Sequence, residues 1–190
     1  MPKRKDNLLP RYPRKWFSWS QYNTFVNKGW MEYCSRYLYG ENKENPAMML
    51  GKKVAEMIER DEEQEDEVLE HLRTFLPQYE HKEYKIEAEF GGIKLLGFLD
   101  GFSPPNNCGE YKTGRLWTQE MADRSEQLSW YALLLHLRHK IKPEEIRFIV
   151  HWMPTVWEVG SIVQPTGEIQ NFETKRTTKD ILRIGAKIIK

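Results

Sequence analysis

The spacing of apolar residues changes along the chain, and its first part has a helical pattern. Apolar positions there recur every three or four residues, which is typical of helices with one buried face. The pattern predicts helices over residues 20–29, 30–39 and from Ala47 onward. Ser20 is placed to cap the first of them. The acidic run DEEQEDE, residues 61–67, separates two groups of apolar residues in the long helical segment, and we expect a break there.

From Lys82 the apolar spacing changes to two, which is the period of a strand with one buried face. Gly91-Gly92 and the stretch PPNN are turn signals, so the pattern predicts three consecutive strands joined by hairpins. These strands cover residues 82–90, 93–102 and 107–112.

The rest of the chain predicts further strands and helices around this meander. Residues 146–153 are almost continuously apolar, which is typical of a buried central strand, and residues 156–163 predict an antiparallel edge strand. Helical patterns cover residues 118–139, with Thr118 as the N-cap, and residues 177–189. This order predicts an α/β domain with one central mixed β-sheet and helices on both of its faces.

The hairpin between the second and third strands brings two carboxylates together. If its turn is centred near Pro105, Asp100 lies opposite Glu110, and Lys112 shares the face of Glu110. Opposed carboxylates destabilise a strand pair, so this register predicts a positive charge between them, either Lys112 or a divalent cation. Alternation puts Asp100 on one face with three apolar residues, namely Leu96, Phe98 and Phe102.

Asp100 and Glu110 are hard oxygen ligands of the kind that metal-dependent phosphodiester hydrolysis requires. The backbone carbonyl of Tyr111 is a further oxygen ligand, and Lys112 can orient the attacking water and stabilise developing negative charge. Because no histidines or cysteines converge here, we expect Mg²⁺ or Mn²⁺ rather than zinc. The spacing D-x9-E-x-K is a loose pattern, and a surface hairpin in which Lys112 neutralises Glu110 explains it equally well.

The following helix carries polar residues that suit a nucleic-acid site. Gln127 and Tyr131 are four residues apart and share one face, and Arg124 and Arg138 extend the same stripe. Arg124 and Gln127 suit phosphate contacts, and Tyr131 suits a phosphate contact or base stacking. An ordinary amphipathic helix with a polar flank is the alternative reading.

Arg115 and Trp117 follow the third strand and form a second candidate contact. An arginine and a tryptophan at a strand end suit the clamping of a nucleic-acid strand or stacking on it. A tryptophan that only packs in the interior explains this position equally well.

Composition narrows the classes of function. The 190 residues carry a net charge of only +1, yet lysine and arginine gather near both ends of the chain, which is the footprint that a nucleic acid needs. Cys34 and Cys108 form no CxxC pair, so we expect no iron–sulfur cluster, no zinc finger and a reducing compartment. No run of 18 apolar residues predicts a membrane span, and the first ten residues lack the apolar core of a secretory signal.

Three short motifs, GFLD at 97–100, EYK at 110–112 and QLSWY at 127–131, resemble conserved motifs of RecB-type nuclease domains. These domains belong to the PD-(D/E)xK, restriction-endonuclease-like superfamily, which includes lambda-type exonucleases and CRISPR-associated nucleases. FSWSQYNTF near the start and LGKKVAEMIE at 50–59 resemble the beginning of the same domains, so the resemblance covers about residues 16–160 in matching order.

The resemblance implies a restriction-endonuclease-like fold and assigns roles to single residues. Asp100 and Glu110 would bind the metal ion and Lys112 would serve the attacking water. Many relatives have a metal-binding histidine where this chain has Ala55, which leaves the neighbouring Glu56 as the expected acidic contribution. The remaining residues are expected to organise the site and contact DNA: Gln127 and Tyr131.

The expected function is therefore a metal-dependent DNA nuclease, most simply an exonuclease in DNA recombination, repair or phage DNA processing, acting on single- or double-stranded DNA. We expect a flexible basic arm over residues 1–15 and a single nuclease domain over residues 16–190. The resemblance implies a cytoplasmic protein of a bacterium or a phage, and leaves open a homo-oligomer or a recombination partner protein.

Two other functions are compatible with the sequence. The first is a non-catalytic nucleic-acid-binding module that retains the nuclease fold, since the first motif helix is altered and both ends are basic. The second is an unrelated hydrolase that uses Asp100 and Glu110 as an acid–base pair, as glycosidases do. Lys112 beside these carboxylates and the basic stripe on the next helix argue against it.

Overall fold

The computed structural model describes residues 15–41, 44–158 and 162–189. The predicted basic arm lies outside these residues, except for Lys15. No described helix is long and apolar enough to cross a membrane.

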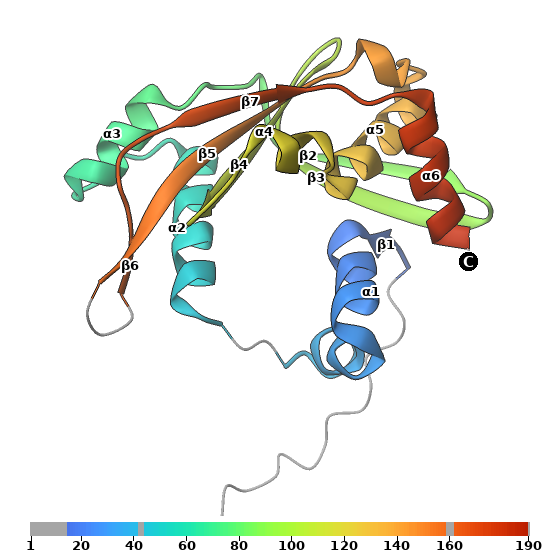
Figure 1. The fold of residues 1–190 in the computed structure, drawn as a ribbon, viewed down its shortest axis with the longest axis horizontal. Coiled ribbons are helices and arrows are strands. Elements are labelled where there is room, and N and C mark those ends of the chain that lie inside the picture. The colour runs from blue at the N-terminus through green and yellow to red at the C-terminus, as the bar shows by residue number, and fades with distance from the viewer. Residues whose placement is uncertain (1–14, 42–43, 159–161, 190) are drawn as a thin grey trace, which may run out of the picture.

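The strands of the described chain form one mixed sheet around which the rest of the protein is arranged (Figure 1). The order is β1-β3-β4-β5-β6, with β2 paired to β3 and β7 paired to β5. β4 runs parallel to β5 and antiparallel to β3. The strands are β1 (Phe17–Ser18), β2 (His81–Phe90), β3 (Ile93–Ser103), β4 (Asn107–Gly114), β5 (Arg147–Glu158), β6 (Ile162–Pro165) and β7 (Gln170–Thr174).

Helices cover both faces of the sheet and build two apolar clusters. The larger cluster lies between the sheet and the helices α5 and α6, and the smaller one between the sheet and the helices α2 and α3. The predicted central mixed sheet flanked by helices is therefore confirmed. The helices are α1 (Trp19–Tyr33), the π-helical η1 (Cys34–Leu38), α2 (Pro46–Arg60), α3 (Glu67–Phe75), α4 (Gln119–Asp123), α5 (Glu126–His139), the 3₁₀ turn η2 (Pro143–Glu145) and α6 (Thr178–Ile189).

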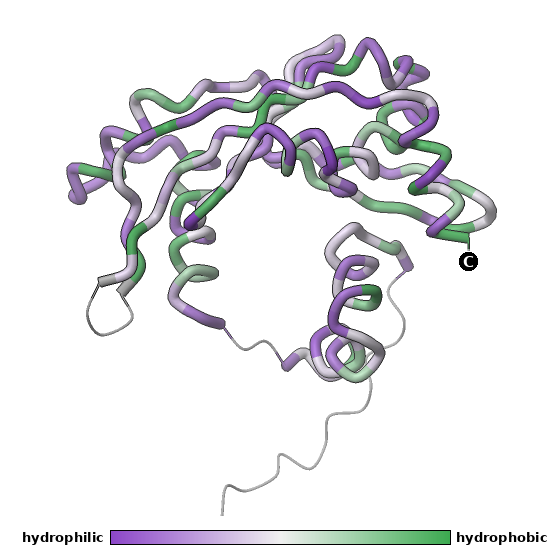
Figure 2. The backbone as a smooth tube through the Cα atoms, in the orientation of Figure 1, coloured by the Kyte–Doolittle hydropathy of each residue, from purple (hydrophilic) through white to green (hydrophobic). Residues whose placement is uncertain are grey.

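The last helix shows how the apolar pattern builds these layers. Hydrophobic and hydrophilic residues alternate along α6 (Figure 2), and Ile181, Ile184 and Ile188 are buried in the larger cluster. Leu182 is 63% exposed because it lies on the opposite side of the helix. The break predicted in the acidic run is confirmed, since α2 ends at Arg60 and α3 begins at Glu67.

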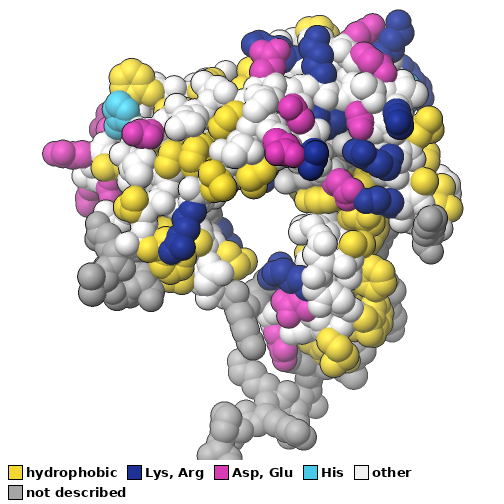
Figure 3. Space-filling model, in the orientation of Figure 1, with side chains coloured by type: hydrophobic (Ala, Val, Ile, Leu, Met, Phe, Trp, Pro, Cys, Tyr) yellow, Lys and Arg dark blue, Asp and Glu magenta, His cyan; other side chains and the backbone are white. Residues whose placement is uncertain are grey.

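The start of the described chain differs from the prediction in its cap. Ser18 caps α1, and its hydroxyl and backbone N–H exchange hydrogen bonds with Gln21, which is a capping box. Ser20 was the wrong serine because only Ser18 is followed three residues later by glutamine. Gly29, with φ 84°, kinks α1. Beyond the kink, α1 and η1 extend away from the sheet, and an opening separates them from α2 (Figures 1 and 3).

The helix predicted over residues 118–139 is two helices. Thr118 caps α4 as expected, but α4 ends at Asp123 and Ser125 caps a new helix, α5. Strand β7 was also missed, because residues 170–174 carry little apolar alternation. Pro154 does not end β5, which continues beyond it by pairing with β6.

The prediction that Leu96, Phe98, Asp100 and Phe102 share one face is wrong. Leu95, Leu99 and Phe102 all belong to the larger apolar cluster, and Phe98 is 43% exposed. In a regular strand only residues an even number apart share a face, so β3 changes the face that it buries between Leu99 and Phe102. The change falls at Asp100, where the pairing of β2 with β3 also skips one position.

An aromatic ring packs over two glycines that face each other across strands β3 and β4 at this place. Gly101 of β3 pairs with Gly109 of β4, and the ring of Tyr79 lies over both. A Cβ atom at Gly109 would lie 2.3 Å from Cε2 of Tyr79, and one at Gly101 would lie 2.3 Å from its Cδ2. The hydroxyl of Tyr79 is held by Nε2 of His151 at 2.8 Å, so the ring cannot move away freely.

We expect Gly109→Ala to destabilise the protein by about 1–3 kcal/mol, the usual cost of overpacking a close contact. The cost should largely vanish in a Tyr79→Ala background, where the clashing ring is absent. Denaturant unfolding of the two single variants and the double variant measures this coupling. Gly51→Ala in α2 is the control, because its Cβ would meet only an ordinary 3.4 Å contact and alanine favours a helix. Equal costs of Gly109→Ala in both backgrounds would contradict the packing described here.

Candidate active site

The site lies where strands β3 and β4 separate. Their pairing runs from Ser103↔Asn107 to Gly101↔Gly109, which is the register predicted from the turn near Pro105. The ladder stops there, one position short of the predicted pair Asp100 and Glu110. Oδ2 of Asp100 instead accepts a hydrogen bond from the backbone N–H of Tyr111 at 2.8 Å. A side chain thus takes the place of a strand partner and fixes Asp100 in the fork.

Glu110 is held beside Asp100 by two side chains. It is 4% exposed, and its Oε1 accepts hydrogen bonds from Nζ of Lys112 at 2.5 Å and from Nε2 of Gln127 at 2.7 Å. Lys112 also donates to Oε1 of Gln127 at 3.0 Å. The prediction that Lys112 shares the face of Glu110 is confirmed. The other oxygen of Glu110, Oε2, is buried and has no hydrogen-bond partner among the described residues.

Gln127 joins the helix α5 to this network. Besides its bonds to Glu110 and Lys112, its Nε2 donates to the hydroxyl oxygen of Tyr131 at 2.9 Å. α5 can approach β3 this closely because residue 97 is glycine: a Cβ atom there would lie 2.6 Å from Leu134 and 3.2 Å from the Tyr131 ring. The glycine of GFLD and the two polar residues of QLSWY therefore act together in placing the network.

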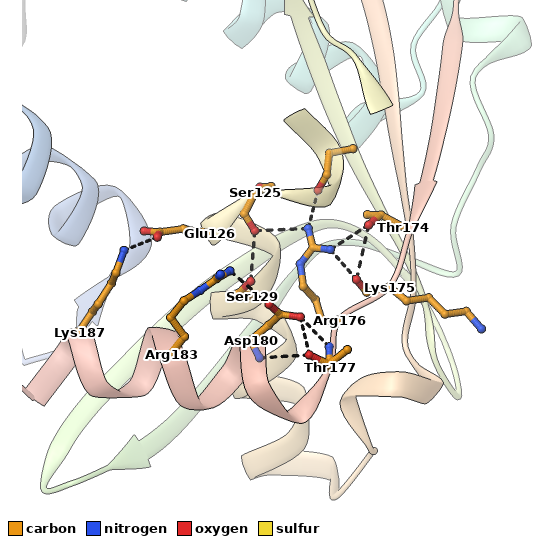
Figure 4. A network of polar contacts seen from close by, with 11 residues as sticks. Ser125, Glu126, Ser129, Thr174, Lys175, Arg176, Thr177, Asp180, Arg183 and Lys187 are labelled. Atoms are coloured by element: carbon orange, nitrogen blue, oxygen red, sulfur yellow. Dashed lines mark hydrogen bonds and ion pairs between the residues drawn. The ribbon is translucent and has the colours of Figure 1, made fainter. Parts of the chain in front are cut away.

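A second polar network fixes the beginning of α5 (Figure 4). The guanidinium of Arg176, 1% exposed, donates to the backbone oxygens of Ala122 at 2.5 Å and Ser125 at 3.4 Å. It also donates to Oγ1 of Thr174 at 2.9 Å. Since Ser125 caps α5 two residues before Gln127, this buried arginine holds the part of the helix that reaches the site.

The fork opens into a cavity of about 250 Å³. Asp100, Glu110, Lys112 and Gln127 line it, together with Tyr111. Two acidic residues that the sequence did not single out line it as well: Glu59 and Glu83. Glu83 has a left-handed backbone, with φ 48°, which is uncommon for a residue other than glycine and is frequent at functional sites.

Negative charge dominates this cavity. Burial, and next the charge of Glu110, raise the pKa of Asp100 well above its ordinary value. Burial and the neighbouring Glu59 and Glu110 raise the pKa of Glu83. Burial, the largest single influence, would lower the pKa of Lys112, but the charge and hydrogen bond of Glu110 and the charge of Asp100 together outweigh it and raise that pKa. Lys112 therefore stays charged, and more than one carboxylate competes for it.

The residues present fit a divalent cation. Asp100 and Glu110 offer hard oxygen atoms, and Oε2 of Glu110 is buried without a partner, a costly state unless another group satisfies it. Across the described ranges no group of three or more His, Cys, Asp or Glu side chains is arranged to hold an ion. Two carboxylates suffice for Mg²⁺, which keeps several waters and uses substrate oxygens as further ligands.

Glu56 does not reach the cavity, and its predicted role is corrected. The residues of α2 that line the cavity include Gly51, Ala55 and Glu59, which are four residues apart and form one stripe. Glu56 lies about 100° further round the helix and is exposed. The acid on the correct face is Glu59, one turn after Ala55, and helical spacing from Ala55 could have found it. Glu83 had no such signal, because its position depends on local backbone geometry.

Three predicted nucleic-acid contacts are placed differently from the expectation. Arg124 is the C-cap of α4, before the break that separates α4 from α5, so it is not on the stripe of Gln127. Its side chain is 79% exposed and pairs with Glu120. Tyr131 is only 6% exposed and can organise the site but cannot stack on a base. Trp117 is half-buried and packs against the larger apolar cluster.

Comparisons with known proteins bear on the fold. No protein-family model matches the chain, and no curated protein matches its sequence. A solved structure does match: the crystal structure of a proposed exonuclease from Eubacterium rectale, with a TM-score of 0.59 and 13% identity. The match covers 90% of this chain and 76% of that protein. The chain thus has an exonuclease-like fold.

Proposed function

We propose that this protein is a Mg²⁺- or Mn²⁺-dependent deoxyribonuclease. The observation that carries the proposal is the network at the β3–β4 fork, in which Glu110 is bonded to Lys112 and Gln127 while Asp100 stands beside it. Four residues from two strands and a helix converge in a cavity with a surplus of carboxylates. Such a surplus repels a phosphodiester on its own, but it suits a divalent cation, which would neutralise the phosphate charge in metal-dependent hydrolysis.

Each residue has a role that its contacts support. Asp100 and Glu110 would hold the metal ion, with the backbone carbonyl of Tyr111 as a further ligand; when bound, the ion lowers the pKa of a water and neutralises phosphate charge. Lys112 would orient the attacking water and stabilise negative charge on the phosphate. Gln127 keeps Lys112 in place, and Tyr131 keeps Gln127 in place.

We further propose that cleavage proceeds from a DNA end, as in an exonuclease of recombination, repair or phage DNA processing. The support is the ordered set of RecB-type motifs together with the exonuclease-like fold. Glu83 and Glu59 line the cavity and would tune the affinity for the metal ion, directly or through water. Arg115, which is exposed near the end of β4, would contact the DNA backbone.

The test is cleavage of end-labelled linear DNA, single- and double-stranded, with Mg²⁺, Mn²⁺ or EDTA. We expect products that shorten from an end in either metal and none in EDTA, and we expect closed circular DNA to resist. DNA that is bound in EDTA but cut under none of these conditions would overturn the proposal in favour of the non-catalytic binding module. Cutting of circles would retain the nuclease and overturn the exonuclease.

A further inference from the structure

An exposed tryptophan stands at the edge of the sheet beyond the cavity. Past Pro154, β5 leaves its partners β4 and β7 and pairs only with β6, from Thr155↔Pro165 to Glu158↔Ile162. Trp157 lies on this extension and is 44% exposed. The guanidinium carbon of Arg115 lies 4.9 Å from the centre of its ring.

The arginine and the ring lie next to the proposed cleavage site. Thr113 of β4 and Met153 of β5 line the cavity and are direct neighbours in the sheet. Trp157 follows Met153 by four residues within β5, an even number, so its side chain continues the face of the sheet that borders the cavity. Arg115 directly follows Gly114, the last residue of β4, and its place beside the cavity comes from its contact with the Trp157 ring.

We propose that Trp157 and Arg115 form a stacking platform for an unpaired base of a single-stranded DNA, next to the nucleotide in the cavity. A guanidinium over an aromatic ring is a stable cation–π pair, and it holds the ring in place before any ligand arrives. The guanidinium can also contact a phosphate of the same strand. The ring thus suits the base of a nucleotide, and the guanidinium suits its phosphate.

The platform selects single strands for a physical reason. Inside a duplex each base is paired and stacked on both neighbours, so only the end pair presents a face to a protein ring, whereas the bases along a single strand are free to stack on one. Stacking on aromatic side chains tolerates any base, which suits an enzyme without sequence preference. The inference rests on the proposed nuclease function for the meaning of the cavity, but the binding that it predicts does not require cleavage.

The test compares two fluorescein-labelled strands of equal length and charge, a thymidine oligonucleotide and one built only of abasic sites, in EDTA at fixed salt. We expect the protein to bind the thymidine strand more tightly, by at least about fivefold in Kd, because only that strand can stack. Trp157→Leu should remove this ratio, and Trp157→Phe should retain most of it. Phe75→Leu changes a still more exposed aromatic residue on α3, 64% exposed, and as the control it should leave the ratio unchanged.

The outcomes separate the platform from the nuclease. If the ratio is the same in Trp157→Leu and the wild type, or if the wild type binds both strands equally or neither, the platform is overturned, and the cleavage assay decides the nuclease independently. If the ratio depends on Trp157 but no metal supports cleavage, the platform stands and the nuclease falls. Arg115→Lys should weaken binding of the thymidine strand more than binding of the abasic strand, because lysine keeps the charge and loses the planar stack. Equal weakening of both would show that Arg115 contributes charge only and would overturn its place in the platform.

Discussion

Lys112→Met is expected to lower the rate of DNA cleavage by about 10²–10³-fold, the usual loss when one preorganised group that stabilises transition-state charge is removed. Methionine fills a similar volume, so the cavity keeps its shape. The change removes the ammonium that contacts both Oε1 of Glu110 and Oε1 of Gln127. Single-turnover cleavage of labelled DNA at saturating Mn²⁺ measures the effect.

A matched control separates loss of this group from loss of a lysine in general. Lys142, 75% exposed and paired with Glu145, lies outside the cavity, and Lys142→Met should cleave at the wild-type rate. Circular dichroism and DNA binding in EDTA should show that the Lys112 variant is folded and still binds. If the Lys112→Met protein cleaves as fast as the wild type, Lys112 has no role in the reaction.

The sequence was informative where the chemistry follows from local spacing. The two-residue period of EYK places Lys112 beside Glu110, and the four-residue period of QLSWY places Gln127 beside Tyr131, so both contacts could be predicted. The register of the hairpin followed from its turn. Each of these relations depends on the geometry of one element or of two consecutive strands.

The sequence failed where the position of a residue depends on distant parts of the chain. The break at residues 124–125 is fixed by Arg176, about 50 residues later, which binds the backbone oxygens of Ala122 and Ser125. The face of β3 changes at Asp100 because the chain separates from β4 there, and no alternation of residues records this. Trp157 was likewise missed, since a hairpin extension beyond a proline looks like any other edge strand.

Asp100→Asn is expected to change activity and stability in opposite directions. The rate of DNA cleavage should fall by about 10²–10³-fold. The substitution removes one of the two carboxylates predicted to bind the ion, and asparagine is a much weaker metal ligand than a carboxylate. Without metal, the variant should be as stable as the wild type or more stable. Asparagine can still accept the hydrogen bond of the Tyr111 N–H, and it removes the repulsion between two carboxylates in the fork.

The stability of the wild type without metal should depend on pH through Asp100. Burial and Glu110 raise the pKa of Asp100 above its value of 3.8 in the unfolded chain. The folded state therefore binds the Asp100 proton more tightly than the unfolded state does. The stability that protonated Asp100 contributes is fully present below about pH 4 and is lost as pH rises through the folded-state pKa. Thermal unfolding of wild type and variant in EDTA should show this loss in the wild type alone.

A bound metal ion should restore the stability that the wild type loses as pH rises. An ion bound between the carboxylates would raise the melting temperature of the wild type, and this increase should grow with the logarithm of the metal concentration above the Kd; the Asp100→Asn protein should show little of it. Ser103→Ala, a change on the same strand outside the cavity, should keep the full metal response. A variant that is less stable than the wild type in EDTA at neutral pH, yet gains as much stability from Mn²⁺, would show that Asp100 is a structural hydrogen-bond acceptor rather than half of a metal site.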